Sequence, residues 1–174
     1  MAVALALPRR LRLRSRGLRE RFGPEYDRAL ETYGAPSRAE RELMARAKRV
    51  RRFHLRDLSE ADRARLSATW SEVQAHFVDE PLRAVQEANE LIKNIMAARG
   101  YPEADFDQRV ADLSVDHPDV VQHYRAARAL AQGGAEGRNT EELRQAVIHF
   151  RALFAELAEA PAIARGRTLQ HARA

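Results

Sequence analysis

Apolar residues recur at every third or fourth position through most of the chain, a spacing that places them along one face of a helix. The pattern is strongest in three long segments, which predict the main helices of the fold: residues 59–78, 80–99 and 140–158. No segment alternates apolar and polar residues over the length of a strand. The sequence therefore predicts an all-α fold, an irregular bundle of five to seven helices with short connections and a basic N-terminal arm.

Proline, glycine and capping residues indicate where the shorter helices begin and end. A helix is expected from Pro24 to about Tyr33, because proline is well tolerated in a first turn. Ser37, with Glu40 three residues later, has the spacing of a capping box and predicts the start of a second helix that runs to about Phe53. These two helices would precede the three long ones.

The same signals predict the remaining boundaries. Ser59 and Asn139 are expected to cap the helices that follow them. Pro102 and Pro118 are each expected in the first turn of a short helix. The helices 59–78 and 80–99 are joined so closely that they should lie antiparallel.

Length and composition are those of one folded domain. The chain has 174 residues, of which 45% are apolar, so it can bury a sizeable core. The pattern divides it into a basic arm (1–21), a single helical domain (22–160) and a loose basic tail (161–174). The absence of cysteine excludes disulfides and thiolate metal sites, and it fits a reducing compartment.

The net charge of +5 is concentrated in the arm. Residues 1–21 contain one acid, Glu20, and seven arginines, whereas the other 153 residues sum to −1. A block of like charge is typical of a segment that binds an anionic partner, although it can also be a solvated arm. The residues expected to contact anionic lipid or phosphate are Arg9, Arg10, Arg12, Arg14, Arg16, Arg19 and Arg21.

Motifs for catalysis and for cofactor binding are missing. No two histidines have the i, i+4 spacing of a helical metal site, and there is neither a G-x-S-x-G nor a P-loop sequence. The sequence therefore predicts no enzyme, no cofactor and no metal site.

One segment, residues 99–125, concentrates turn formers, acids, histidines and tyrosines. Four of its side chains could line a ligand pocket or an undetected active site: Tyr101, His117, His123 and Tyr124. Aromatic residues at helical spacing more often belong to the core, so both interpretations stay open.

The first eight residues are apolar but too few to cross a bilayer, which takes about 20 residues. Their basic residues follow the apolar run, the reverse of the order in a signal peptide. We therefore expect either a solvated N-terminus or the remnant of an anchor whose arginines lie on the cytoplasmic side.

Four segments together resemble a known group of proteins. They are RFGPEYDR (Arg21–Arg28), FVDEPLRAV (Phe77–Val85), RGYP through LSVDHP (Arg99–Pro118) and TEELRQAVIHFRALF (Thr140–Phe154). Residues 19–158 resemble uncharacterised bacterial proteins, often labelled hypothetical or secreted, from actinobacteria and other G+C-rich lineages. Members commonly carry one N-terminal transmembrane helix, to which only residues 1–7 could correspond here.

The resemblance implies a membrane-proximal domain on the cytoplasmic side, and it brings no catalytic residues. The expected function is a non-enzymatic helical interaction domain, cytoplasmic or at the cytoplasmic face of the inner membrane. Its arm would contact anionic lipid, and another surface would meet a protein partner not identified by the sequence. The alternatives are non-specific nucleic-acid binding by the arm, and a small-ligand binder or enzyme that uses residues 99–125.

Overall fold

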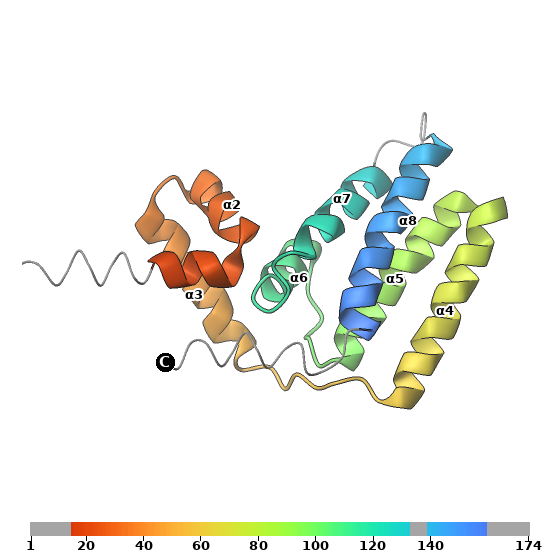
Figure 1. Cartoon of the computed structure of the whole chain (residues 1–174), viewed down its shortest axis with the longest axis horizontal. Coiled ribbons are helices and arrows are strands. Elements are labelled where there is room, and N and C mark those ends of the chain that lie inside the picture. The colour runs from red at the N-terminus through yellow and green to blue at the C-terminus, as the bar shows by residue number, and fades with distance from the viewer. Residues whose placement is uncertain (1–14, 133–138, 160–174) are drawn as a thin grey trace, which may run out of the picture. The chain divides into compact units, whose positions relative to one another are not determined.

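The computed structural model describes residues 15–132 and 139–159. Every regular element in these residues is a helix, so the predicted all-α fold is confirmed (Figure 1). The chain divides into two compact units. The first unit comprises the described residues 15–52 and 111–119, and the second unit comprises the described residues of 53–110 and 120–159.

The first unit contains a helical segment over residues 15–22, α2 (Pro24–Tyr33) and α3 (Pro36–Val50), and α2 packs against α3. The predicted bounds of α2 are confirmed, and Gly34 ends the helix with a left-handed backbone (φ 69°). The buried side chains of this unit include Phe22, Tyr26 and Leu43.

The described end of the predicted arm is helical. Residues 15–22 form a helix in which Arg16 pairs with Glu20 one turn later at 2.9 Å. Phe22, at the end of this helix, is fully buried. Burial of this ring and the i, i+4 ion pair both favour helix over an extended chain.

The capping box predicted at Ser37 is wrong. Ala35 is the N-cap of α3 and makes no side-chain cap bond, while Pro36 occupies the first turn. Glu40 is buried, and its carboxylate accepts hydrogen bonds from the hydroxyls of Tyr26 (3.0 Å) and Ser15 (2.5 Å). Glu40 therefore serves the interior of the unit and not the helix start.

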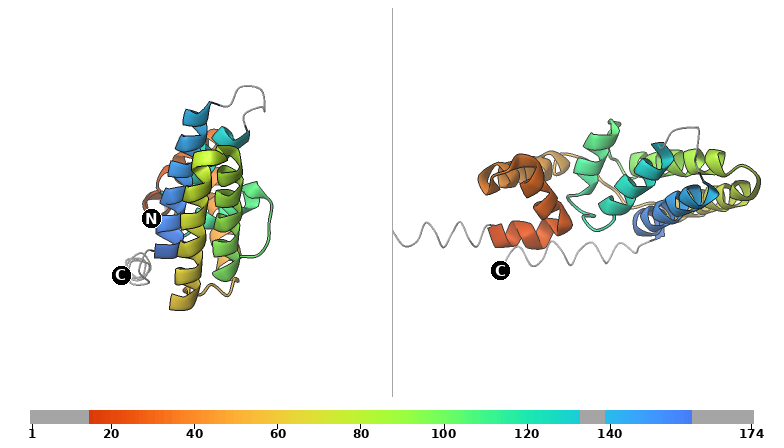
Figure 2. Two further views of the ribbon diagram at one scale, coloured as in Figure 1. Left: turned by 90° about the vertical axis from the view of Figure 1, so that its right-hand side faces the viewer. Right: turned by 90° about the horizontal axis from the view of Figure 1, so that it is seen from above.

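The second unit is built on α4 (Glu60–Asp79), α5 (Pro81–Ala98), α7 (Val121–Gln132) and α8 (Thr140–Phe154). These helices lie side by side, with α8 packed against both α5 and α7, and α5 against α4 (Figures 1 and 2). The three long helices lie where the sequence places them. Only Glu80 separates α4 from α5, and the two form the expected antiparallel pair.

The predicted caps of the long helices are confirmed. The Ser59 hydroxyl accepts a hydrogen bond from the backbone N–H of Asp62 at 3.0 Å, and the Asn139 side chain accepts one from the N–H of Glu141 at 2.5 Å. Trp70 belongs to the core, where its ring stacks on Phe154 with centroids 5.2 Å apart.

Two short helices begin later than predicted. The helix expected at Pro102 is α6, Phe106–Leu113, because the Asp105 carboxylate accepts a hydrogen bond from the N–H of Gln108 (2.8 Å) and so caps the helix there. The helix expected at Pro118 is α7, which begins at Val121, and residues 118–120 form a turn.

The last helix ends in a π-helical turn, η1 (Ala155–Glu159). Two arginines bind its carbonyl groups: Arg99 Nη1 donates to Leu157 (3.2 Å) and Arg63 Nη1 donates to Ala158 (3.3 Å). Arg99 is 3% exposed. Positive side chains at a helix C-terminus satisfy carbonyls that lack partners within the helix and complement its dipole.

Candidate functional site

The exposed side of α3 carries a series of cations. Arg38, Arg41 and Lys48 are exposed and fall within an arc of about 80° around the helix at 100° per residue. The opposite side packs Leu43, Ala47 and Val50 into the core. Arg51 and Arg52 follow, also exposed, in the turn after the helix. We call these five cations the α3 cationic surface: Arg38, Arg41, Lys48, Arg51 and Arg52.

Two other arginines of α3 are used inside the first unit. Arg46 pairs with Glu42 (3.1 Å) and with the buried Glu25 (3.7 Å). Arg49 pairs with Asp112, whose side chain is only 3% exposed, at 2.6 Å. These two arginines compensate acids that have been removed from water, and they are not free to bind a partner.

The α3 cationic surface has no such compensation. Within residues 15–132 and 139–159, none of its five side chains forms an ion pair. The Arg41 guanidinium donates only to the Ser37 carbonyl of its own helix, at 3.2 Å. Exposed cations without acidic neighbours attract an anionic partner most strongly.

The described part of the arm continues the positive charge. Arg16 and Arg19 are exposed, although each has an acidic neighbour: Arg16 pairs with Glu20, and Arg19 lies 3.8 Å from Asp27 and over the Tyr26 ring. Arg21 lies over the Phe22 ring. The other four predicted contact residues lie outside the described residues: Arg9, Arg10, Arg12 and Arg14.

The residues assigned to the first unit differ sharply in formal charge from the rest of the chain. Residues 1–52 and 111–119 carry 15 Lys and Arg against 9 Asp and Glu, a formal charge of +6. The remaining residues carry 15 against 16, a charge of −1. Three of the nine acids are buried in the first unit: Glu25, Glu40 and Asp112. Their burial leaves its surface more cationic than the total suggests.

Burial also affects the ionisation of Tyr26. Removal from water, with the Glu40 carboxylate beside the hydroxyl, raises the pKa of Tyr26. The phenol therefore stays protonated and donates its hydrogen bond to Glu40. This cluster is structural, because it closes the interior of the first unit beneath its cationic exterior.

The four residues predicted as a possible pocket have separate neighbours. Tyr101 is buried with its ring edge-on to Phe53. Tyr124 is fully buried against Phe106, and its hydroxyl accepts a hydrogen bond from Arg109 at 3.2 Å.

The two histidines of that set lie in different units. His117 is buried in the first unit, where its backbone N–H donates to the Leu113 carbonyl at 2.9 Å. His123 lies in the second unit beside His149, with their Nδ1 atoms 2.9 Å apart. His149 belongs to the last helix, and sequence reasoning missed it, because the two residues are 26 positions apart and share no motif.

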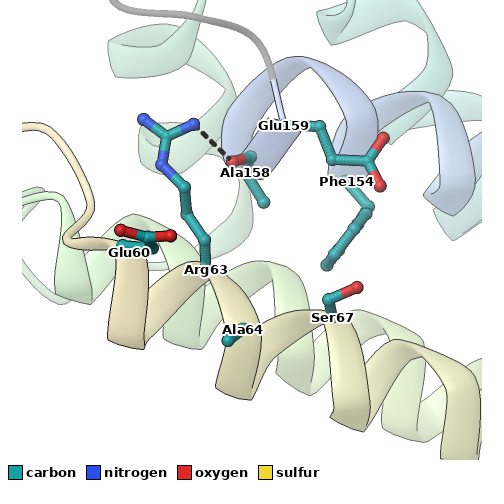
Figure 3. A pocket seen from close by; sticks show the side chains of 7 residues that line it. All are labelled: Glu60, Arg63, Ala64, Ser67, Phe154, Ala158 and Glu159. Atoms are coloured by element: carbon teal, nitrogen blue, oxygen red, sulfur yellow. Dashed lines mark hydrogen bonds between the residues drawn. The ribbon is translucent and has the colours of Figure 1, made fainter.

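A hollow of about 360 Å³ lies between α4 and the end of α8 (Figure 3). Its walls combine apolar and charged side chains: Glu60, Arg63, Ala64, Ser67, Phe154, Ala158 and Glu159. The volume suits a small ligand. Arg63, however, donates to the Leu58 and Ala158 carbonyls, and no histidine or cysteine accompanies Ser67 on these walls. The hollow thus carries one hydroxyl and two carboxylates but no imidazole or thiol.

Two further features are absent from the part of the chain that the structure describes. No helix there is both long enough and apolar enough to cross a bilayer. No three side chains of His, Cys, Asp or Glu are grouped there so that they could hold a metal ion.

Comparison of the chain with models of known protein families, with curated proteins and with solved structures finds no match.

Proposed function

We propose that this protein is a non-enzymatic interaction domain whose first unit binds an anionic membrane surface. The observation that supports the proposal best is the α3 cationic surface, five exposed cations that form no ion pair within the described residues. The arginine-rich residues 1–21 add to the same charge.

The geometry of α3 suits contact with a flat surface. Arg38 and Lys48 are ten residues apart, about 15 Å along the helix. Because the opposite side of α3 is buried, its cations can approach one plane together. A Lys or Arg near an anionic bilayer contributes about 1 kcal/mol, so Arg38, Arg41 and Lys48 would contribute roughly 3 kcal/mol before Arg51, Arg52 and the arm are counted.

Lipid is favoured over nucleic acid for two reasons. Single-stranded nucleic acids are bound by exposed aromatic platforms, and the aromatic rings of the described first unit, Tyr33 excepted, are buried. The resemblance to membrane-proximal bacterial proteins also favours lipid. The phosphates of duplex DNA would still bind the same cations, so an experiment must distinguish DNA binding from lipid binding.

Co-sedimentation of the full chain with vesicles tests the proposal. We expect binding to vesicles that contain a third phosphatidylglycerol, no binding to phosphatidylcholine alone, and loss of binding as salt rises. Equal binding to both vesicle types, or to neither, would contradict the proposal. Competition by a 30-bp DNA duplex is the second arm. If duplex at equal phosphate concentration removes all of the protein from the vesicles, the nucleic-acid function replaces the lipid one.

A further inference from the structure

The hollow between α4 and the end of α8 is not used by the proposed function. All of its lining residues belong to the second unit, whereas the α3 cationic surface belongs to the first. Glu60, Ala64 and Ser67 line it from α4, where spacings of three and four residues place side chains on one face of the helix. Figure 3 shows the Phe154 ring directed from α8 toward Ser67.

The apolar wall of the hollow is fixed by packing. Phe154 is 1% exposed, and its ring stacks on Trp70. Ala158 belongs to η1, whose Leu157 carbonyl accepts a hydrogen bond from the buried Arg99. A ligand would therefore meet an apolar wall that is already formed, which reduces the entropy lost on binding.

The charged side chains of the hollow differ in how far they are compensated. The Arg63 guanidinium donates to two backbone carbonyl groups, and Glu159 pairs with Arg151 at 3.0 Å. Glu60, in contrast, forms neither an ion pair nor a side-chain hydrogen bond within the residues that the structure describes. One carboxylate at the edge of an apolar hollow is thus left to attract a cation.

We propose that the hollow binds a small organic ammonium ion, a primary amine with an apolar body. Glu60 and Ser67 are seven residues apart, about 10 Å along α4. The ammonium group would pair with Glu60 at one end, while the hydrocarbon body would cover Phe154 and Ala158 at the other. A volume of about 360 Å³ accommodates an amine with a single ring.

Other classes of small ligand fit this hollow less well. A hard metal cation takes about six or more oxygen ligands, and no three acidic or histidine side chains are grouped to hold a metal within the described residues. An anion would have to compete with two carbonyl groups for Arg63, and the walls carry no second cation.

Titration of the full chain with 2-phenylethylamine, followed by nuclear magnetic resonance of the backbone amides, tests the inference. We expect a dissociation constant of about 1 mM or below, with shifts concentrated in residues 60–67 and 154–159. The indole N–H of Trp70, the single tryptophan of the chain, reports on the same place because its ring stacks on Phe154. The neutral analogue 2-phenylethanol should bind about threefold more weakly.

Two variants and a matched control locate the bound amine. Glu60→Gln removes the free carboxylate and should weaken binding by about twofold to fivefold, as expected for an exposed ion pair. Ser67→Leu places an apolar side chain in the hollow and should weaken binding by about tenfold or more. Glu72→Gln removes an exposed acid of the same helix that does not line the hollow, so it should leave the affinity unchanged.

Three results would each overturn the inference: no saturable binding up to about 10 mM amine, equal affinities for the amine and the alcohol, or unaltered affinity in both Glu60→Gln and Ser67→Leu. Ser67→Leu leaves every charge of the protein in place, so its binding to anionic vesicles should match that of the wild type. The ligand site and the membrane contact can therefore fail independently.

Discussion

Gly100 lies at a point of the second unit where no side chain fits. Its backbone has φ +89°, and a Cβ atom there would lie 2.3 Å from the His54 carbonyl oxygen. The close approach arises because the connector before α4 docks on the end of α5. The N–H of Arg56 donates to Arg99 O (3.0 Å), and its guanidinium donates to Ala98 O (2.8 Å).

Gly100→Ala should therefore destabilise the protein by about 2 kcal/mol or more, since it combines an unfavourable left-handed conformation with a clash against backbone. Urea unfolding followed by circular dichroism measures the change. Gly17→Ala is the control, because an added Cβ there meets nothing within 4 Å, and alanine should be neutral or favour the helix by up to about 1 kcal/mol. Equal effects of the two substitutions would contradict this account of Gly100.

The arginines of α3 mark a limit of sequence reasoning at the scale of single residues. Pattern alone places Arg41, Arg46, Lys48 and Arg49 together on the polar side of the helix. It cannot show that Arg46 and Arg49 reach acids far away in the chain, because Glu25 and Asp112 become their neighbours only through folding. Long-range pairing of this kind leaves no local spacing to detect.

Arg49→Met should thus be costly, because it leaves the buried Asp112 carboxylate without its 2.6 Å partner. We expect a loss of about 2 kcal/mol, reduced from the value for a fully buried pair because the Arg49 side chain is 36% exposed. Arg41→Met, on the exposed side of the same helix, should change stability by less than about 0.5 kcal/mol. Urea unfolding of the two variants measures both losses of stability. A greater loss in Arg41→Met than in Arg49→Met would contradict the division of the α3 cations into structural and free ones.

At the scale of elements, strong local signals made α4 and α5 predictable. Ser59 and Pro81 mark their starts, and apolar periodicity fills their length, so each boundary was within a residue or so of the structure. The errors occurred where two start signals compete. Asp105, three residues after Pro102, caps α6, because a carboxylate that accepts a backbone N–H stabilises a helix start more than proline alone.

The pairing of α7 with α8 should depend on pH through His149. Burial, and then the charge of His123, lower the pKa of His149 below its ordinary 6.5. The unfolded chain therefore takes up this proton at a higher pH than the folded one. This group leaves stability unchanged above about pH 7 and reduces it as pH falls through about 6.5 towards the lower folded value.

Replacing His149 by Asn should accordingly lessen the loss of stability between about pH 7.5 and 5.5. Urea midpoints of the wild type and of His149→Asn at both pH values, in buffer with a chelator, measure the difference. An identical loss in the two proteins would show that another group is responsible.

At the scale of the whole molecule, the sequence shows that positive charge is concentrated in one part of the chain. It does not show which helix surface carries that charge. The sequence assigns the excess to residues 1–21, whereas the structure adds a second set of cations on α3, without ion pairs in the described residues. Both sets of cations belong to residues 1–52 and 111–119, whose formal charge is +6. The remaining residues of the chain carry a formal charge of −1. We therefore expect the first unit, and not net charge alone, to drive binding.

Two variants of equal net charge isolate that claim. One removes three cations of the α3 cationic surface: Arg38→Gln, Arg41→Gln and Lys48→Gln. The other removes three cations of the second unit that pair with neighbouring acids: Arg65→Gln, Arg83→Gln and Lys93→Gln. At about 1 kcal/mol for each free cation, the first variant should lose about 3 kcal/mol of membrane affinity, roughly a hundredfold, and the second much less.

The affinity of these two variants for phosphatidylglycerol-containing vesicles at 0.1 M salt is the most direct test. Circular dichroism would confirm beforehand that both are folded. We expect the α3 variant to bind far more weakly than the wild type, and the second-unit variant to bind nearly as well as the wild type. Equal weakening of the two variants, or wild-type binding by the α3 variant, would contradict the claim that the exposed cations of α3 form the membrane contact.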